Sequence, residues 1–391
     1  MQGKTGPMQL SLCTYTIEDL VPQDHFLRKL EAALDLFEPV PDHSTISQNR
    51  RRRPLFRKVF RRLFEEIVRQ CVEAGLVSGR VVGTDSTHVK ARASRASEYL
   101  REVEEEPGVY RERLDQYEQA AQTELARKTG RRQKKRVKQI KRDRRRPHRQ
   151  VSRTDSEAGY LNRPGKPKGM HYLSHQTLDT DHGIILDVAV TSGDVSDVAP
   201  YPDQLERVHR EIVPIQCATA DAIYDFPLAH QVLGEHGITF CVCPIKSHDQ
   251  TGVEIKRDAF RYDEENDGYH WLNTLRRSAG GLHWVYSADR RDCQTCSLKE
   301  NCLSECRKNG ARKLERSYFE PAVRRDLSRQ QEPEYQEALR LRQIWCEGSF
   351  AAQKWGHNLT RVLRRGIEAA EDHCLLSTTA LNLKRMIRCL G

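Results

Sequence analysis

The sequence has little of what a membrane or secreted protein needs. No apolar run approaches the roughly 20 residues that span a bilayer, and Met1–Cys13 lacks the apolar core of a secretory signal. Hydrophobic residues make up 37% and aromatic residues 7% of the chain, and we find no convincing basic amphipathic helix for a membrane surface. We therefore expect an intracellular protein without a membrane partner, whose twelve cysteines are mostly reduced thiols.

Acidic residues are too few to balance the basic ones. The 391 residues include 65 Lys and Arg against 55 Asp and Glu, which gives a formal net charge of +10. Such a balance favours a polyanionic partner, chiefly nucleic acid. A chain of this length is expected to form about two or three domains.

The basic residues are densest in Asn49–Pro54 and in the tract Arg127–Arg149. A charge run is often only a solvated surface, but runs this long commonly serve as interaction tails. We expect them to contact phosphates, which gives affinity without reading the sequence of the nucleic acid. The residues assigned to this role are Arg50, Arg51, Arg52, Arg131, Arg132, Lys134, Lys135 and Arg136.

The apolar pattern predicts helices first and a mixed order of strands and helices afterwards. Residues 14–80 carry apolar side chains at helical spacing, and a helix over 55–74 is expected to end at Gly75 and Gly79. The β-branched segment 81–89 predicts a strand. Further elements are a hairpin over 172–191, helices over 198–210, 227–236, 339–363 and 372–390, and strands over 216–223 and 238–244. Residues 95–150 are expected to form a long helix or helical hairpin that becomes a solvated arm, and the whole order predicts an α/β fold.

Three acidic residues stand at positions where a site is expected. Asp85 lies within the first strand, and Asp221 lies at the carboxyl end of another, where sites gather in open α/β sheets. Glu347 lies on the predicted helix 339–363, and Lys354 and Arg361 follow at intervals of seven, so that all three share one face. A solvated strand residue and a salt-bridged helix surface are the plain explanations for each residue alone. Together, these carboxylates supply oxygen ligands from separate segments for two Mg²⁺ ions, and the two cations would hold phosphates.

Asp225 and a group of four cysteines are further candidate ligands. Asp225 is the nearest rival of Asp221, and its place at the strand end predicts a helix N-cap instead. The polar segment around residue 300 contains Cys293, Cys296, Cys302 and Cys306. This spacing is typical of a zinc knuckle, which orders a segment without a core of its own. Four reduced surface thiols are the equal alternative.

Several stretches resemble the DDE-class transposases of bacterial insertion sequences, whose catalytic domain is similar to ribonuclease H. The matching stretches are Val82–Ala91, Val151–Ala158, Ala220–Asp225, Glu347–Lys354, Gly356–Gly366 and Leu381–Arg385, together with His25–Arg28 and Asp42–Thr45. The resemblance implies a ribonuclease H-like mixed sheet flanked by helices. It further implies a helical N-terminal region over 1–80, a catalytic domain over 81–244 that a basic segment 95–150 interrupts, a cysteine-bearing insertion over 245–335, and completing helices over 336–391.

The same resemblance implies the chemistry. Asp85, Asp221 and Glu347 would bind two Mg²⁺ or Mn²⁺ ions, with Lys354 beside them, and one structural Zn²⁺ is a further candidate. The partners would be element ends and target DNA, bound by a dimer or higher oligomer in the bacterial cytoplasm near the nucleoid. Relatives often carry an Arg four residues before the Glu, where this chain has Gln343 and Arg342 is one place off.

Two alternatives to a complete transposase stay open. Only Asp35–Pro41 joins the two N-terminal matching pieces, whereas relatives often have a longer helical region there. A catalytically inactive or shortened derivative that only binds DNA is therefore one alternative. A nuclease of the same fold, which hydrolyses DNA without joining it, is the other.

Overall fold

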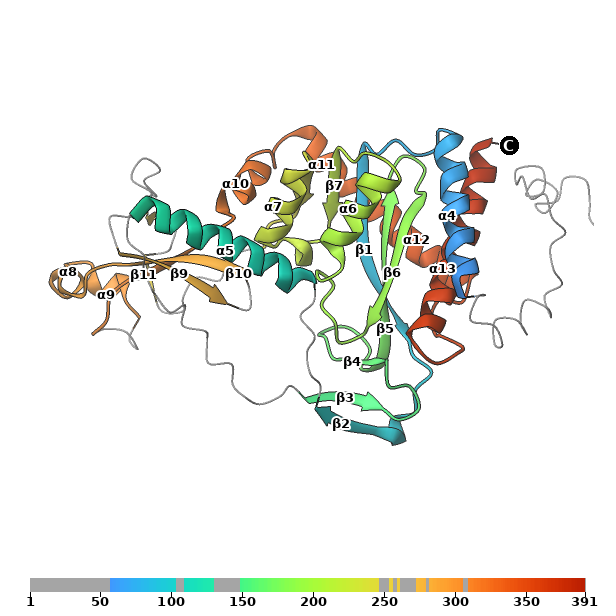
Figure 1. The fold of residues 1–391 in the computed structure, drawn as a ribbon, viewed down its shortest axis with the longest axis horizontal. Coiled ribbons are helices and arrows are strands. Elements are labelled where there is room, and N and C mark those ends of the chain that lie inside the picture. Colours follow the sequence, from blue (N-terminus) through green and yellow to red (C-terminus); the bar gives the residue numbers. More distant parts are fainter. Residues whose placement is uncertain are drawn as a thin grey trace, which may run out of the picture.

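A mixed six-stranded sheet forms the centre of the molecule (Figure 1). The computed structural model describes residues 57–102, 109–129, 148–245, 253–255, 259–260, 272–278, 281–304 and 309–390. The strands of the central sheet are β1 (Val81–Lys90), β4 (Gly159–Leu161), β5 (Gly169–Asp179), β6 (Ile185–Ser192), β7 (Cys217–Ala220) and β8 (Thr239–Val242). β1 lies between antiparallel β5 and parallel β7; β8 continues parallel beyond β7, and β4 and β6 both pair with β5.

Helices cover both faces of this sheet. They are α4 (Arg57–Glu73), α6 (Tyr201–Glu211), α7 (Pro227–Glu235), α11 (Pro333–Arg342), α12 (Gly348–Gly356) and α13 (Ile367–Leu390). Neighbouring residues of a strand point to opposite faces. On β8, Phe240 lies 5.7 Å from the ring of Tyr201 of α6, whereas Cys241 packs with Tyr335 and Ala338 of α11. The predicted fold class, a mixed α/β sheet flanked by helices, is confirmed and is compatible with a ribonuclease H-like core.

The predicted insertion forms a smaller unit at one end of the molecule (Figure 1). It contains an antiparallel sheet of β9 (Leu272–Ser278), β10 (Gly281–Ser287) and β11 (Lys313–Ser317), and the helices α8 (Arg290–Thr295), α9 (Lys299–Cys302) and α10 (Glu320–Leu327). The helix α5 (Val109–Thr129) buries Leu114 and Ala121 in a cluster with Leu282 of β10 and Leu228 of α7. α5 therefore packs against both β10 of the predicted insertion and α7 beside the central sheet.

Two predicted elements were partly wrong. The segment 95–150 does contain the long helix α5, but its ends are strands, β2 (Glu98–Glu102) and β3 (His148–Ser152), which pair antiparallel. This pairing joins residues about fifty positions apart, so the local pattern of apolar residues did not indicate it. The helix predicted over 339–363 ends at Gly356, and Asn358 just beyond it has a left-handed φ of 55°.

The end of α4 follows the prediction. α4 ends shortly before Gly75 and Gly79, which both have a φ of 72° that other residues rarely adopt. In the part of the chain that the structure describes, no helix combines the length and the apolar character needed to cross a bilayer.

Candidate active site

Asp85 and Asp221 lie at the same level of the sheet. In the parallel pair, Val81 faces Cys217 and Gly83 faces Thr219, an offset of 217 − 81 = 136 positions. Asp221 follows Asp85 by the same 136 positions, so continuing the register places the two aspartates on adjacent chain segments. Neighbouring strands are about 4.8 Å apart, which brings the two carboxyl groups to one edge of the sheet.

The local contacts hold both aspartates in place. Asp85 Oδ1 accepts a hydrogen bond from Ser86 N at 2.7 Å. Asp221 caps η3 (Ala222–Tyr224), where its Oδ1 accepts from Ile223 N at 2.5 Å. Burial raises the pKa of Asp85 to about 6; Arg342 and the Ser86 N–H oppose this, while the charges of Asp221 and Glu347 add to it. The raised pKa of Asp85 is therefore mainly a consequence of its burial.

Arg342 joins Asp85 to Glu347. Its Nη1 donates to Asp85 Oδ2 at 3.2 Å, and its Nη2 lies 3.9 Å from Glu347 Oε1. The two residues of the helix are five positions apart, and the chain between them forms a π turn, η6 (Gln343–Glu347). In a π turn, residues five apart share a face, whereas in an α-helix they point about 140° apart. The π turn therefore aims Arg342 and Glu347 at the same side.

Gly83 allows this helix to approach β1 closely. A Cβ at Gly83 would lie 3.3 Å from Cys346 Sγ and 3.5 Å from Arg342 Cγ. Cys346 is buried at the same contact. Any larger residue at position 83 would therefore push the π turn away from the strand that carries Asp85.

A buried pair of amides fixes the next helix against the sheet. Gln176, which faces Asp85 across β1 and β5, exchanges two hydrogen bonds of 3.0 and 2.8 Å with Gln353 of α12. Ser377 of α13 donates a third, at 3.2 Å, to the same Gln353 oxygen. Both glutamines are at most 1% exposed. Sequence reasoning missed this pair, which holds α12, and with it Glu347, at a set angle.

Lys354 lies near enough to Asp85 for the two charges to interact, and its predicted role at the site stays a prediction. Burial lowers its pKa, the charge of Lys166 lowers it further, and Asp85 raises it. Burial also lowers the pKa of His88 to about 4, with Lys354, His171, Lys166 and Arg163 acting in the same direction. Lys354 and Lys166 thus place positive charge near His88, whereas Arg163 is paired with Asp197.

The predicted position of Arg361 on the same helix face was wrong. The helix ends at Gly356, and the chain then runs beside the end of β1, where Lys90 N donates to Thr360 O at 3.0 Å and Val362 N donates to Lys90 O at 2.8 Å. Arg361 is exposed next to Lys90. It therefore stands on an extended segment, and its contact with DNA stays a prediction.

The prediction that Asp225 is a helix N-cap was wrong for α7. The N-cap of α7 is Phe226, without a side-chain cap bond. Asp225 instead accepts from His230 Nε2 at 3.1 Å and from Ile245 N at 2.7 Å.

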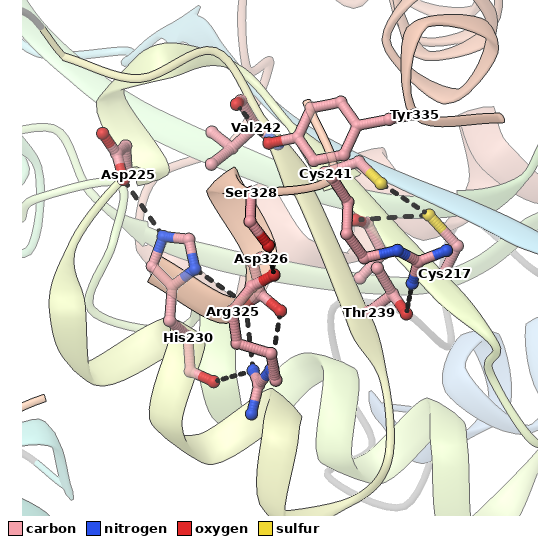
Figure 2. Close-up of polar contacts among 12 residues, drawn as sticks. Cys217, Asp225, His230, Thr239, Cys241, Val242, Arg325, Asp326, Ser328 and Tyr335 are labelled. Atoms are coloured by element: carbon pink, nitrogen blue, oxygen red, sulfur yellow. Dashed lines mark hydrogen bonds and ion pairs between the residues drawn. The ribbon is translucent and has the colours of Figure 1, made fainter. Parts of the chain in front are cut away.

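His230 connects the turn after Asp221 with the insertion (Figure 2). Its other ring nitrogen, Nδ1, lies 2.8 Å from Asp326 Oδ2 on α10, and Arg325 pairs with both oxygens of Asp326 at 2.9 and 3.0 Å. His230 is fully buried. Burial lowers its pKa, but the hydrogen bonds and charges of Asp225 and Asp326 outweigh this and raise it. The His230 ring thus bridges two carboxylates, an arrangement that no sequence spacing indicated.

Several predicted site residues lie outside the described residues. They are Arg50, Arg51, Arg52, Arg131, Arg132, Lys134, Lys135, Arg136 and Cys306. The other three cysteines of the predicted knuckle are described. Burial is the main cause that raises the pKa of Cys302, and the charges of Cys293 and Cys296 raise it further. Cys293 Sγ also accepts from Arg312 N at 3.4 Å. A zinc site there stays a prediction.

The donor set of Asp85, Asp221 and Glu347 fits divalent cations. All three are hard oxygen ligands from separate segments, which is what Mg²⁺ prefers. As the side chains lie, no three His, Cys, Asp or Glu groups among the described residues converge on one point. Arg342 contacts two of the three carboxylates. Their convergence on shared metal ions therefore stays a prediction.

A cavity of about 490 Å³ lies elsewhere, between the π turn, α12 and α13. Its lining includes Trp345, Ala352, Leu381 and Arg385. The guanidinium of Arg385 lies 5.4 Å from the centre of the Trp345 ring. None of the three carboxylates lines this cavity, so it is separate from the candidate active site.

One of the comparisons with known proteins gives a match, in the C-terminal part of the chain. Neither the curated proteins nor the solved structures give a significant match. A family model described as "Transposase DDE domain" matches residues 269–387. The matched range contains Glu347 and Lys354, and it begins after both Asp85 and Asp221. The predicted resemblance to DDE transposases is thus confirmed for this part of the chain, whereas an origin in a bacterial insertion sequence stays a prediction.

Proposed function

We propose that the protein is a transposase that cuts DNA at the ends of an insertion sequence and joins these ends to target DNA. The proposal rests on one observation of geometry. Asp85 and Asp221 lie side by side on adjacent parallel segments, and Arg342 contacts both Asp85 and Glu347. Three carboxylates from two strand ends and a helix suit two-metal phosphodiester chemistry.

The three carboxylates would hold two Mg²⁺ or Mn²⁺ ions. Bound there, the ions would activate the attacking oxygen and stabilise the leaving one. Asp85 is held by Ser86 N and would bind as the carboxylate once a cation replaces the contact with Arg342. Asp221 keeps its orientation through Ile223 N. Arg342 is then free to pair with Glu347 or with a phosphate of the DNA.

The positive residues beside the carboxylates would place the DNA. Lys354 is half-buried and interacts with Asp85, so its ammonium group would bind a phosphate held beside that carboxylate. In the first reaction, water attacks the phosphorus at the element end, and the bond to the 3′ oxygen breaks. The freed 3′-hydroxyl then attacks a target phosphorus and displaces the 3′ oxygen of the target strand.

A cleavage assay on DNA that carries the ends of its own element tests the proposal. We expect Mg²⁺-dependent cuts that leave a 3′-hydroxyl, and joined products when target DNA is added. Asp85→Asn, Asp221→Asn and Glu347→Gln should each lower cleavage by at least 100-fold, an effect of about 3 kcal/mol on the barrier. Glu337→Gln, on a partly exposed residue of α11, is the matched control and should cut normally.

The same assay separates the two alternatives. Binding to element ends without any cut would identify an inactive derivative. Cuts without joined products would identify a nuclease of the same fold.

A further inference from the structure

Trp355 is the most exposed of the large apolar side chains in the described residues. It is 92% exposed, and the next, Leu100, is 69% exposed. Trp345, ten residues earlier, shows the opposite: its ring lies under the Arg385 guanidinium and would collide with any Cβ at Gly183. Trp345 is therefore a packing residue, whereas Trp355 adds nothing to the core.

A single exposed apolar residue needs no explanation by itself, but Trp355 stands close to the candidate active site. It stands eight residues after Glu347 on the same helix, which is about 12 Å along the axis and about 80° around it. Its neighbour Lys354 lies on the side of Asp85. Trp355 thus borders the face of α12 that carries the candidate active site.

The surface around this border is positive. Lys354 and the exposed Lys166 both act on His88, and Arg361 is exposed on the segment that follows α12. A phosphate backbone at the carboxylates would follow these charges. A distance of about 12 Å corresponds to three or four stacked nucleotides at about 3.4 Å each.

We propose that Trp355 stacks on an unpaired base of the DNA strand that the active site holds, three or four nucleotides from the reacting phosphate. The proposal rests on the function proposed above. An aromatic side chain that extends from a positive groove is the usual platform for single-stranded nucleic acid, because every base offers a flat face. In a duplex the bases already stack on one another, so the platform selects frayed or single-stranded ends. A second copy of this chain is the competing occupant.

Binding of the full-length protein to two labelled DNAs tests the proposal. One is a blunt duplex, and the other has the same duplex with a four-nucleotide 3′ overhang that contains 2-aminopurine. Both are measured in Ca²⁺, so that binding is read without cleavage. We expect the wild type to prefer the overhang and to quench the 2-aminopurine fluorescence.

Trp355→Ala should abolish the quenching and weaken overhang binding by about 5- to 140-fold, the range for loss of one stacked base. Trp355→Phe should restore part of both, and Leu100→Ala, on an exposed residue of β2, should change neither. Unchanged overhang affinity and quenching in Trp355→Ala would overturn the proposal. So would a loss of self-association in sedimentation with DNA binding intact, which would assign Trp355 to a second copy. Quenching by a protein that never cuts DNA would retain the stacking role and reject the proposed transposase activity instead.

Discussion

Removing the imidazole of His230 is expected to loosen the link between the catalytic domain and the insertion. The substitution His230→Gln leaves two buried carboxylates, Asp225 and Asp326, without their shared cation. Removing one partner of a buried ion pair costs about 3–5 kcal/mol. Arg325 still pairs with Asp326 at 2.9 and 3.0 Å, so we expect the lower end, about 3 kcal/mol.

The pH dependence distinguishes a lost ion pair from lost packing. The pKa of His230 is raised in the folded protein. Its charge therefore stabilises the fold fully below the ordinary histidine pKa of about 6.5, and this stabilisation is lost as the pH rises through the folded-state pKa. The difference in melting temperature between wild type and His230→Gln should be largest near pH 6 and should narrow toward pH 9.

Thermal unfolding followed by fluorescence across this pH range is the assay. His236→Gln is the matched control, because His236 stands at the end of the same helix and its side chain is 28% exposed. It should lower the melting temperature little at any pH. A wild-type advantage over His230→Gln that stays constant from pH 6 to pH 9 would refute the charged bridge and leave His230 as a packing residue.

Three further predictions follow from the helix, the cysteines and the basic tract. Deleting Ile344 should turn the π turn into an α-helix and leave cleavage intact, whereas deleting Ala351 should rotate the following turn by about 100° and abolish cleavage. Purified protein should contain one zinc per chain under reducing conditions, lost in Cys296→Ser/Cys302→Ser; absence of zinc from the unmutated protein would retire the knuckle. Neutralising several arginines in Arg127–Arg149 should weaken DNA binding for every sequence and flatten its salt dependence; an unchanged slope in a binding titration would show that the tract contacts no phosphate.

The sequence predicted those parts of the fold that depend on local patterns. The β-branched run at Val81–Val89 became β1, and the apolar spacing of 55–74 became α4. Asp85 lies within β1 and Asp221 directly follows β7, where the strand pattern placed them, and the parallel pairing of β1 with β7 brings them level. Local propensity and the period of apolar residues were sufficient for these elements.

Contacts between distant residues could not be predicted in this way. Gln176 and Gln353 are 177 positions apart, and His230 and Asp326 are 96 positions apart. Each pair is buried and polar, so its members must find partners or cost free energy. A sequence shows that such a residue is polar, but which partner satisfies it depends on the packing of the whole sheet and its helices.

Arg342 shows how a spacing rule fails when the helix itself changes. The resemblance places an arginine four residues before the glutamate, and on a regular α-helix Arg342, at five residues, would point about 140° away from Glu347. The structure has a π turn over those five residues, in which this spacing returns the side chain to the same face. Gln343, which occupies the expected position by count, is exposed, while Arg342 contacts both Asp85 and Glu347. The extra residue in the sequence and the extra residue in the turn thus compensate each other, and the arginine that meets the carboxylates is identified by geometry where counting alone selects its neighbour.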